Sequence, residues 1–189
     1  MEPLAKIFGT PARLKMLRLF LYNQTTGFTL ADIAARAKLS SDAVKAELSD
    51  LLAADLLRKK GTRATAKYQV NPRFEHLAAL DAFIRDTTNI RPADILALLK
   101  RAGSLRFVAL TGLFMSEQET PADILIVGDA LDERALANAI RSLEAELGRE
   151  IRYASFPTAD LRHRLGVYDR LLRDIFDYPH RVLMDKIGV

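Results

Sequence analysis

The chain has 189 residues, nearly half of them apolar and about a quarter charged, which is the ordinary balance of a globular protein with one large or two small domains. No apolar run approaches the ~20 residues that cross a bilayer, and the N-terminus has no signal-peptide pattern, so we expect a cytoplasmic protein without a membrane partner. Cysteine is absent and the three histidines are scattered, which excludes thiolate ligands and leaves no metal-ligand spacing. We therefore expect neither a metal nor a cofactor.

The charge is divided unevenly along the chain. Residues 1–75 hold 13 Lys and Arg against 7 Asp and Glu, a balance of +6, whereas residues 76–189 hold 15 against 17, a balance of −2. A basic N-terminal part is typical of a domain that meets a polyanion.

Three helix starts are marked in the N-terminal part. Thr10 caps a helix with Pro11 in its first turn. Thr29 caps a second helix, with Asp32 completing a capping box. Ser40 caps a third helix, which we expect over residues 41–57.

The third helix has one apolar and one polar face. Val44, Leu48, Leu51 and Leu52 recur at helical spacing, while Ser41, Asp42, Lys45 and Ser49 point the other way. A short polar face of this kind suits a helix that lies in the major groove of DNA and reaches base edges.

A basic hairpin follows the third helix. Residues 65–70 alternate between apolar and polar side chains, as a strand with one wet face does, and Gly61 supplies the turn before them. Asn71-Pro72 ends this strand because proline cannot continue a ladder.

Residues 11–70 resemble the ArsR-like winged helix-turn-helix family of bacterial and archaeal transcription regulators. The segment 29–34 is similar to the family's second helix, and 51–58 is similar to its run from the recognition helix into the wing. The family's metal-binding cysteines are absent, so metal sensing is not implied.

The resemblance implies that helix 41–57 occupies the major groove and that a basic wing over 58–67 lies on the phosphate backbone. The DNA-binding residues that follow from this are Ser40, Ser41, Asp42, Lys45, Ser49, Arg58, Lys59, Lys60, Arg63 and Lys67, with Arg13, Lys15 and Lys38 as further backbone contacts. A protein-interaction module with a solvated basic face is the alternative.

The middle of the chain carries two more helical patterns. An apolar stripe of Phe74, Leu77, Leu80 and Ile84 is either a lid on the N-terminal core or a dimer seam, and we favour a homodimer with two recognition helices. Pro92 starts another helix, which Gly103 ends. We place the domain boundary between residues 87 and 92.

From residue 106 the pattern alternates between strands and helices. We expect strands over 106–110, 123–127 and 150–156, a helix over 134–147, and a helical tail over 161–184 that Thr158 caps and that is interrupted near Gly166 and Pro179. The strand 123–127 is nearly all apolar, which predicts a central position in the sheet.

This part of the chain, residues 105–189, resembles the minimal nucleotidyltransferase domain. Gly112 matches the family's glycine and Asp123 its first aspartate, but Leu113, Leu125 and Arg152 stand where the serine, the second aspartate and the third carboxylate belong. Two-metal chemistry needs those carboxylates, so we expect no catalytic residue here. Asp123 is then either an ion-pair partner of Arg152 or, with Gly112 and Arg152, a candidate site for a nucleotide or other small anion.

The sequence thus predicts an α+β protein. Its parts are a winged helix-turn-helix over 1–72, linker or dimerisation helices over 73–104, and a small, inactive nucleotidyltransferase-like domain with a mixed sheet and a helical tail over 105–189. We expect a transcription regulator that binds double-stranded DNA and is not an enzyme. The alternative is a nucleotidyltransferase that modifies a protein or RNA partner and is targeted by its winged helix.

Overall fold

A computed structural model describes residues 3–62, 65–115, 117 and 119–189. These residues form a mixed α+β fold with two small β-sheets. The chain divides into two compact units: unit 1 comprises residues 1–90 together with 144–150, and unit 2 comprises residues 91–143 and 151–189. Among the helices so described, none has both the length and the apolar character that crossing a membrane requires.

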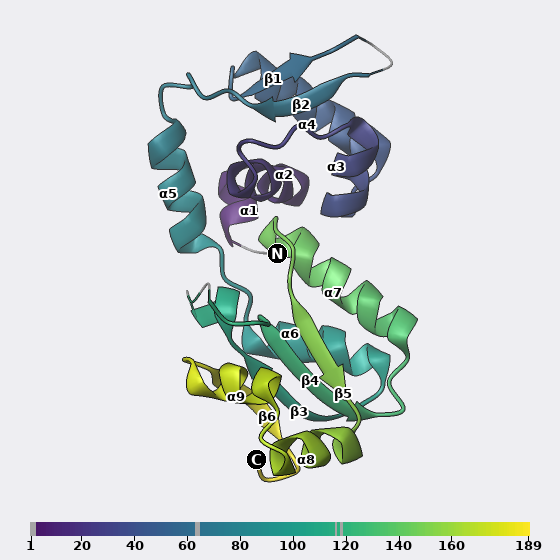
Figure 1. Cartoon of the computed structure of the whole chain (residues 1–189). Coiled ribbons are helices and arrows are strands. Elements are labelled where there is room, and N and C mark those ends of the chain that lie inside the picture. The colour runs from purple at the N-terminus through teal and green to yellow at the C-terminus, as the bar shows by residue number, and fades with distance from the viewer. Residues whose placement is uncertain (1–2, 63–64, 116, 118) are drawn as a thin grey trace. The chain divides into compact units, whose positions relative to one another are not determined.

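Unit 1 is built from helices, a β-hairpin and a further helix (Figure 1). One apolar cluster joins these elements, with Phe20, Ile33 and Val44 from three successive helices almost fully buried in it. The hairpin strands pair antiparallel, and Phe28 adds a bridge to Tyr68. The elements are α1 (Pro3–Ile7), α2 (Pro11–Tyr22), α3 (Leu30–Ala37), α4 (Ser41–Ala53), β1 (Leu57–Lys60), β2 (Lys67–Val70) and α5 (Leu77–Thr87).

The three predicted helix starts are confirmed. The hydroxyl of Thr10 accepts the backbone N–H of Arg13 at 2.9 Å, and Ser40 accepts that of Ala43 at 3.2 Å. Thr29 and Asp32 form the complete capping box. These side chains satisfy backbone donors that the first turn of a helix leaves unpaired.

The third helix is shorter than the predicted 41–57. α4 ends at Ala53, Asp55 has φ +58°, and Leu57 already begins β1. Leu57 is buried and pairs with Val70, so a helix through residue 57 would remove it from the hairpin ladder. A left-handed residue at 55 lets the chain turn sharply from helix to strand.

The apolar stripe of α5 covers the core of unit 1. Ile84 is fully buried there, and Phe74, Leu77 and Leu80 are partly buried against the same cluster. Of the two alternatives for this apolar stripe, the structure therefore shows the lid on the core of unit 1. A homodimer stays a prediction.

Unit 2 contains a four-stranded sheet in the order β5-β4-β3-β6. β3 is antiparallel to β4 and to β6, while β4 is parallel to β5, so the predicted mixed sheet is confirmed. Residues 124–127 are fully buried in the predicted central position. The elements are α6 (Pro92–Leu99), a 3-10 turn η1 (Lys100–Ala102), β3 (Ser104–Leu110), a 3-10 turn η2 (Gly112–Met115), β4 (Ile124–Asp129), α7 (Glu133–Leu147), β5 (Tyr153–Phe156), α8 (Thr158–Gly166), α9 (Arg170–Asp177) and β6 (Arg181–Asp185); the last turn of α7 belongs to unit 1.

The predicted interruptions of the helical tail are confirmed, since α8 ends at Gly166 and α9 ends at Asp177, just before Pro179. The prediction of a tail over 161–184 is wrong in two other respects. Its last part is strand β6, which pairs with the edge of β3 that β4 leaves open. Thr158 lies inside the first turn of α8, and its backbone N–H donates to Asp129 Oδ1 at 3.1 Å. The carboxylate of Asp129, at the end of β4, therefore caps this helix in place of the Thr158 hydroxyl. Both errors arise from contacts between segments far apart in the sequence.

Candidate nucleic-acid interface

The outer face of α4 is polar and open to solvent. All five residues predicted to face the groove are exposed: Ser40, Ser41, Asp42, Lys45 and Ser49. Lys45 Nζ pairs with Asp42 Oδ1 at 3.2 Å, a surface contact that a stronger partner replaces at little cost. The face therefore offers hydroxyl, carboxylate and ammonium groups with few fixed partners.

Glu47 and Asp50 add two negative charges to α4, and Arg13 of α2 offsets one of them by contacting both carboxylates. Arg13 Nε donates to Glu47 Oε2 at 2.7 Å, a second N–H of Arg13 donates to Asp50, and the Thr10 hydroxyl donates to Glu47 Oε1 at 2.5 Å. The hydrogen bond to Glu47 is the main reason that the pKa of Arg13 lies above its ordinary value. We call the contacts of Thr10 and Arg13 with Glu47 and Asp50 the α2–α4 brace.

The further backbone contacts expected at Arg13 and Lys15 are occupied within unit 1. Arg13 belongs to the brace, and Lys15 Nζ pairs with Glu146 at 2.8 Å. Lys38 is exposed at the end of α3, where it has a left-handed backbone. Of these three expected contacts, two are therefore engaged in ion pairs with carboxylates.

The hairpin register sorts its cations onto two faces. Arg58 lies opposite Gln69 and Lys60 opposite Lys67, while Lys59 lies opposite Tyr68 on the other face. Lys59, Lys60 and Lys67 are exposed; Arg58 is half-buried, and its Nε atom has no hydrogen-bond partner. Arg63 lies outside the described residues.

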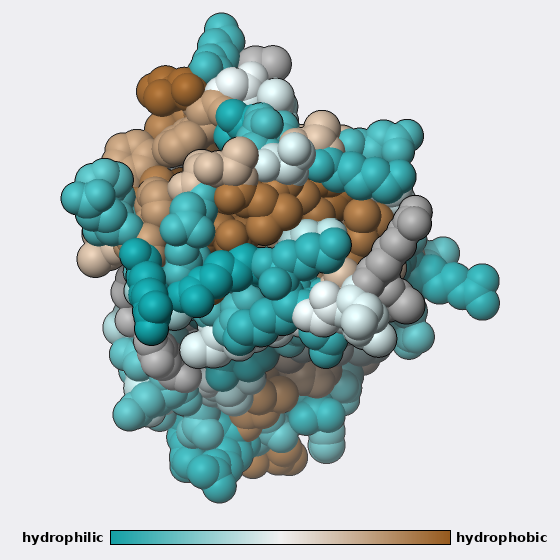
Figure 2. Space-filling model, turned by 90° about the horizontal axis from the view of Figure 1, so that it is seen from above, coloured by the Kyte–Doolittle hydropathy of each residue, from teal (hydrophilic) through white to brown (hydrophobic). Residues whose placement is uncertain are grey.

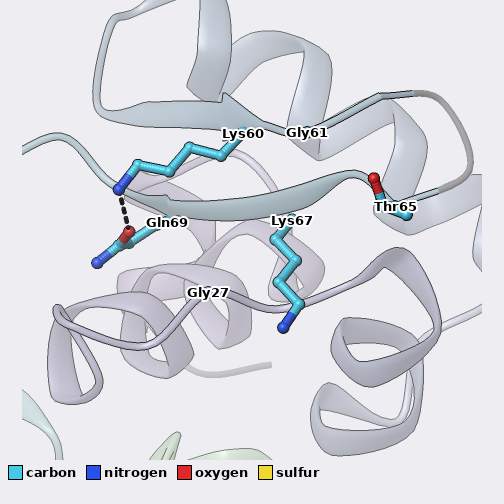
Figure 3. A pocket seen from close by; sticks show the side chains of 6 residues that line it. All are labelled: Gly27, Lys60, Gly61, Thr65, Lys67 and Gln69. Carbon is cyan, nitrogen blue, oxygen red and sulfur yellow. Dashed lines mark hydrogen bonds between the residues drawn. The ribbon is translucent and has the colours of Figure 1, made fainter.

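A hollow of about 360 Å³ opens beside the face that carries Lys60 and Lys67. Gly27, Lys60, Gly61, Thr65, Lys67 and Gln69 line it (Figure 3). We call it the Gly27 hollow. Gly27, Gly61, Thr65 and Gln69 were not among the predicted site residues, since only the strand register and the return of the 24–28 loop bring them beside the lysines.

Seen from above, this end of the molecule carries projecting hydrophilic side chains with a band of hydrophobic residues between them (Figure 2). The surface is therefore not a uniformly charged sheet.

In unit 2 the structure brings Gly112, Asp123 and Arg152 together. Asp123 is buried, and its carboxylate accepts four N–H groups: Leu113 N at 2.9 Å, Arg152 N at 2.8 Å, Arg152 Nε at 3.2 Å and Arg152 Nη2 at 2.9 Å. A Cβ atom on Gly112 would lie 2.3 Å from Asp123 Oδ1. Glycine is therefore needed for the backbone to approach this carboxylate.

The ion pair between Asp123 and Arg152, one of the two readings of these residues, is present at 2.9 Å. Arg152 Nη1 also donates to Thr120 O at 2.7 Å, so each guanidinium nitrogen has a partner. Burial raises the pKa of Asp123, but the hydrogen bonds from Arg152 and Leu113 outweigh it and hold that pKa below its ordinary value. Within the described ranges, no three His, Asp or Glu side chains gather in a way that would hold a metal ion.

Comparison of the chain with known protein families, with curated proteins and with solved structures found no match. The geometry described above therefore carries the functional argument.

Proposed function

We propose that unit 1 is a winged helix-turn-helix domain and that the protein is a homodimeric transcription regulator that binds double-stranded DNA. One observation carries the proposal: the exposed polar face of α4 accompanies a hairpin whose cations Lys59, Lys60 and Lys67 form no ion pair with a carboxylate in the described part of the chain. A polar helix can read base edges while neighbouring cations displace counterions from phosphates.

In this mechanism the two elements have separate tasks. α4 enters the major groove, where Ser41, Lys45 and Ser49 contact base edges. The hairpin cations lie against the backbone and fix the register without reading sequence. Arg13 in the α2–α4 brace offsets one of the two negative charges of Glu47 and Asp50, which reduces the repulsion between α4 and the phosphates.

Duplex binding measured over a range of salt concentrations tests the proposal. We expect a steep salt slope, and neutralising Lys59, Lys60 and Arg63 together should weaken binding about equally on all sequences. Replacing Ser41 or Lys45 should instead change which genomic fragments are selected. If the triple neutralisation leaves duplex affinity unchanged, the hairpin does not contact the backbone.

For unit 2 the proposal is a catalytically silent nucleotidyltransferase-like domain that senses a nucleotide or other small anion, or supports dimerisation. The saturated carboxylate of Asp123 supports the absence of catalysis, because all four of its hydrogen bonds would compete with a magnesium ion. Incubation with labelled nucleoside triphosphates, magnesium and cell lysate tests it. Label transfer that Asp123→Asn abolishes would show an active transferase instead.

A further inference from the structure

We infer that the exposed turn between α8 and α9 binds single-stranded nucleic acid, with an unpaired base stacked on Tyr168 and the neighbouring phosphates held by arginines of the two helices. The site lies wholly in unit 2, so it does not depend on duplex binding by unit 1. We call this surface the Tyr168 patch. Its members, all exposed, are Arg162, His163, Val167, Tyr168, Arg170 and Arg173.

The exposed charges of the Tyr168 patch are all basic. The one carboxylate between residues 162 and 173 is that of Asp169, which is half-buried and paired with Arg164 at 3.1 Å. Arg162 has no ion pair within the part of the chain that the structure describes, and Arg170 pairs with Asp174 through an exposed contact at 3.3 Å. Such a contact contributes little, so a phosphate can replace it. The patch therefore fits an anionic partner.

The backbone of Tyr168 is strained. Its φ is +52°, in the left-handed region that bulky side chains rarely adopt, whereas Gly166, two residues earlier, has no positive φ. The ring of Tyr168 is 86% exposed, so it gains little packing in return for this strain. Strain that is retained at an exposed aromatic residue indicates a role in binding rather than in folding.

The turn that carries Tyr168 is held firmly from both sides. The backbone N–H of Tyr168 donates to Leu165 O at 3.3 Å, and that of Asp169 donates to Arg164 O at 2.9 Å. Asp169 Oδ1 caps α9 by accepting the backbone N–H of Leu172 at 3.3 Å. The guanidinium of Arg164 also lies over the ring of Phe156 at 4.6 Å. A ring held in this way loses less conformational entropy when it binds.

The two helices carry the exposed arginines on their outer sides. Leu161 of α8 and both Leu172 and Ile175 of α9 are buried in one apolar cluster with residues of β3 and β4. Both helices therefore cover the same face of the sheet. Nothing lies within 4 Å of the Cβ position of Gly166, so the turn between them is open to a ligand.

This combination of groups favours a single strand over other anionic partners. A base presents a flat π-face to an aromatic ring, and guanidinium groups match the geometry of phosphate. In a duplex the base faces are stacked on one another, so only an unpaired base can stack on Tyr168. A lipid surface is less suited, because Val167 and Tyr168 are the two exposed apolar side chains of the patch.

The first experiment removes the ring and relieves the strain together. Fluorescence anisotropy with a labelled mixed-sequence strand of about 12 nucleotides, as DNA and as RNA, compares the full-length wild type with Tyr168→Gly. We expect the variant to bind about fivefold more weakly or less, as the loss of one stacked base predicts. Its Tm should not fall, because glycine accepts the left-handed backbone. Loss on either strand supports the inference, and the larger loss identifies the sugar that is bound.

Tyr153→Ala is the matched control, since Tyr153 is an exposed tyrosine of unit 2 outside the patch. It should leave single-strand affinity unchanged. A duplex of the same sequence should also bind Tyr168→Gly and wild type equally. Unchanged single-strand affinity in Tyr168→Gly, an equal loss on the duplex, or a lower Tm would each overturn the inference.

The second experiment tests the phosphate contacts. Each phosphate contact on a single strand contributes about 0.7 to the slope of log affinity against log salt, so Arg162→Gln with Arg173→Gln should reduce the slope by about 1.4. Arg91→Gln changes an 82% exposed arginine of unit 2 outside the patch, and it should leave the slope as in wild type. A slope that the double variant does not change contradicts the inference.

Sedimentation with phosphatidylserine vesicles distinguishes a lipid surface from a nucleic acid. We expect vesicle binding to be the same for wild type and Tyr168→Gly. Vesicle binding that Tyr168→Gly abolishes, with single-strand affinity unchanged, would assign the Tyr168 patch to anionic lipid and overturn the inference.

Discussion

Asp123 keeps its charge although its side chain is only 4% exposed. Four N–H groups point at its two oxygens, and three of them come from Arg152, whose side chain is 51% exposed. The carboxylate therefore joins the residue just before β4 to the residue just before β5. In this environment both the charge and the acceptor geometry contribute to stability.

The first prediction concerns this carboxylate. Asp123→Asn replaces one acceptor oxygen with an NH₂ group that faces N–H donors, so we expect a loss of about 2–3 kcal/mol in the free energy of unfolding. Urea denaturation followed by circular dichroism measures it. Asp42→Asn, at an exposed surface pair, is the control and should change stability by less than about 0.5 kcal/mol. Similar small effects of both changes would contradict the role given to Asp123.

The second prediction is the pH dependence of the same group. Because the pKa of Asp123 is lower in the folded state than in the unfolded chain, its contribution is present in full above the ordinary value of 3.8 and is lost as the pH falls through the folded pKa. The stability difference between wild type and Asp123→Asn should therefore be constant near neutral pH and shrink below about pH 4. A difference that grows on acidification would contradict the lowered pKa.

At the scale of elements, the α2–α4 brace joins the start of one helix to the middle of another. Glu47 is nearly buried, and its two oxygens take the Thr10 hydroxyl and the Arg13 guanidinium. Thr10 is also the cap of α2, so the same residue starts one helix and fixes the next. The orientation of the polar face of α4 depends on these contacts.

The third prediction is a coupling energy across the brace. Glu47→Gln and Arg13→Met should each destabilise the protein by about 1–2 kcal/mol, and the double variant by about 1 kcal/mol less than their sum. Chemical denaturation of the wild type, the two single variants and the double variant gives the double-mutant cycle from which this coupling energy is calculated. Strict additivity would mean that the two side chains do not stabilise each other.

The elements that the sequence predicts well are those that local chemistry decides. Thr10, Thr29 and Ser40 cap their helices by accepting the backbone N–H three residues further on, so the local sequence alone determines these helix starts. The end of α4 and the strand β6 depend instead on pairing with Val70 and with β3, which a helical pattern along the chain does not reveal.

The candidate site divides in the same way. The exposure of Ser41, Lys45 and Ser49 follows from helical spacing and was predictable. The Gly27 hollow was missed because it depends on which residues of β1 and β2 stand opposite each other and on the loop that returns beside them. The engagement of Lys15 was missed because Glu146 lies more than a hundred residues further along the chain.

At the scale of the molecule, unit 1 is not one continuous stretch of sequence. Arg18 of α2 is 2% exposed, and its Nη1 donates to Glu146 O at 3.0 Å. Asn23 Nδ2 donates to Gly148 O at 2.9 Å, and Arg36 pairs with Glu150 at 3.0 Å. Residues 144–150 are therefore a structural part of the N-terminal unit.

The fourth prediction tests that attachment at Gly148. Its φ is +77°, and a Cβ atom would lie 2.4 Å from the carbonyl carbon of Arg18. Gly148→Ala should therefore cost about 2–4 kcal/mol in the free energy of unfolding, from backbone strain and overpacking together. Thermal or urea unfolding measures the loss.

Gly166→Ala is the matched control for Gly148→Ala. Gly166 has no positive φ, and nothing lies within 4 Å of its Cβ position. It ends α8, so alanine there should be neutral or stabilise the protein by up to about 1 kcal/mol. Equal behaviour of the two variants would show that residue 148 is not packed against α2.

The late position of residues 144–150 in the sequence also constrains the order in which the protein folds during its synthesis. At roughly 5–20 residues per second, the ribosome delivers residue 150 about 3–12 seconds after residue 90. During that interval the nascent N-terminal unit lacks the carbonyl groups of Glu146 and Gly148, to which Arg18 and Asn23 donate in the finished protein. Its last step of folding must therefore follow the synthesis of residues 91–143 of unit 2.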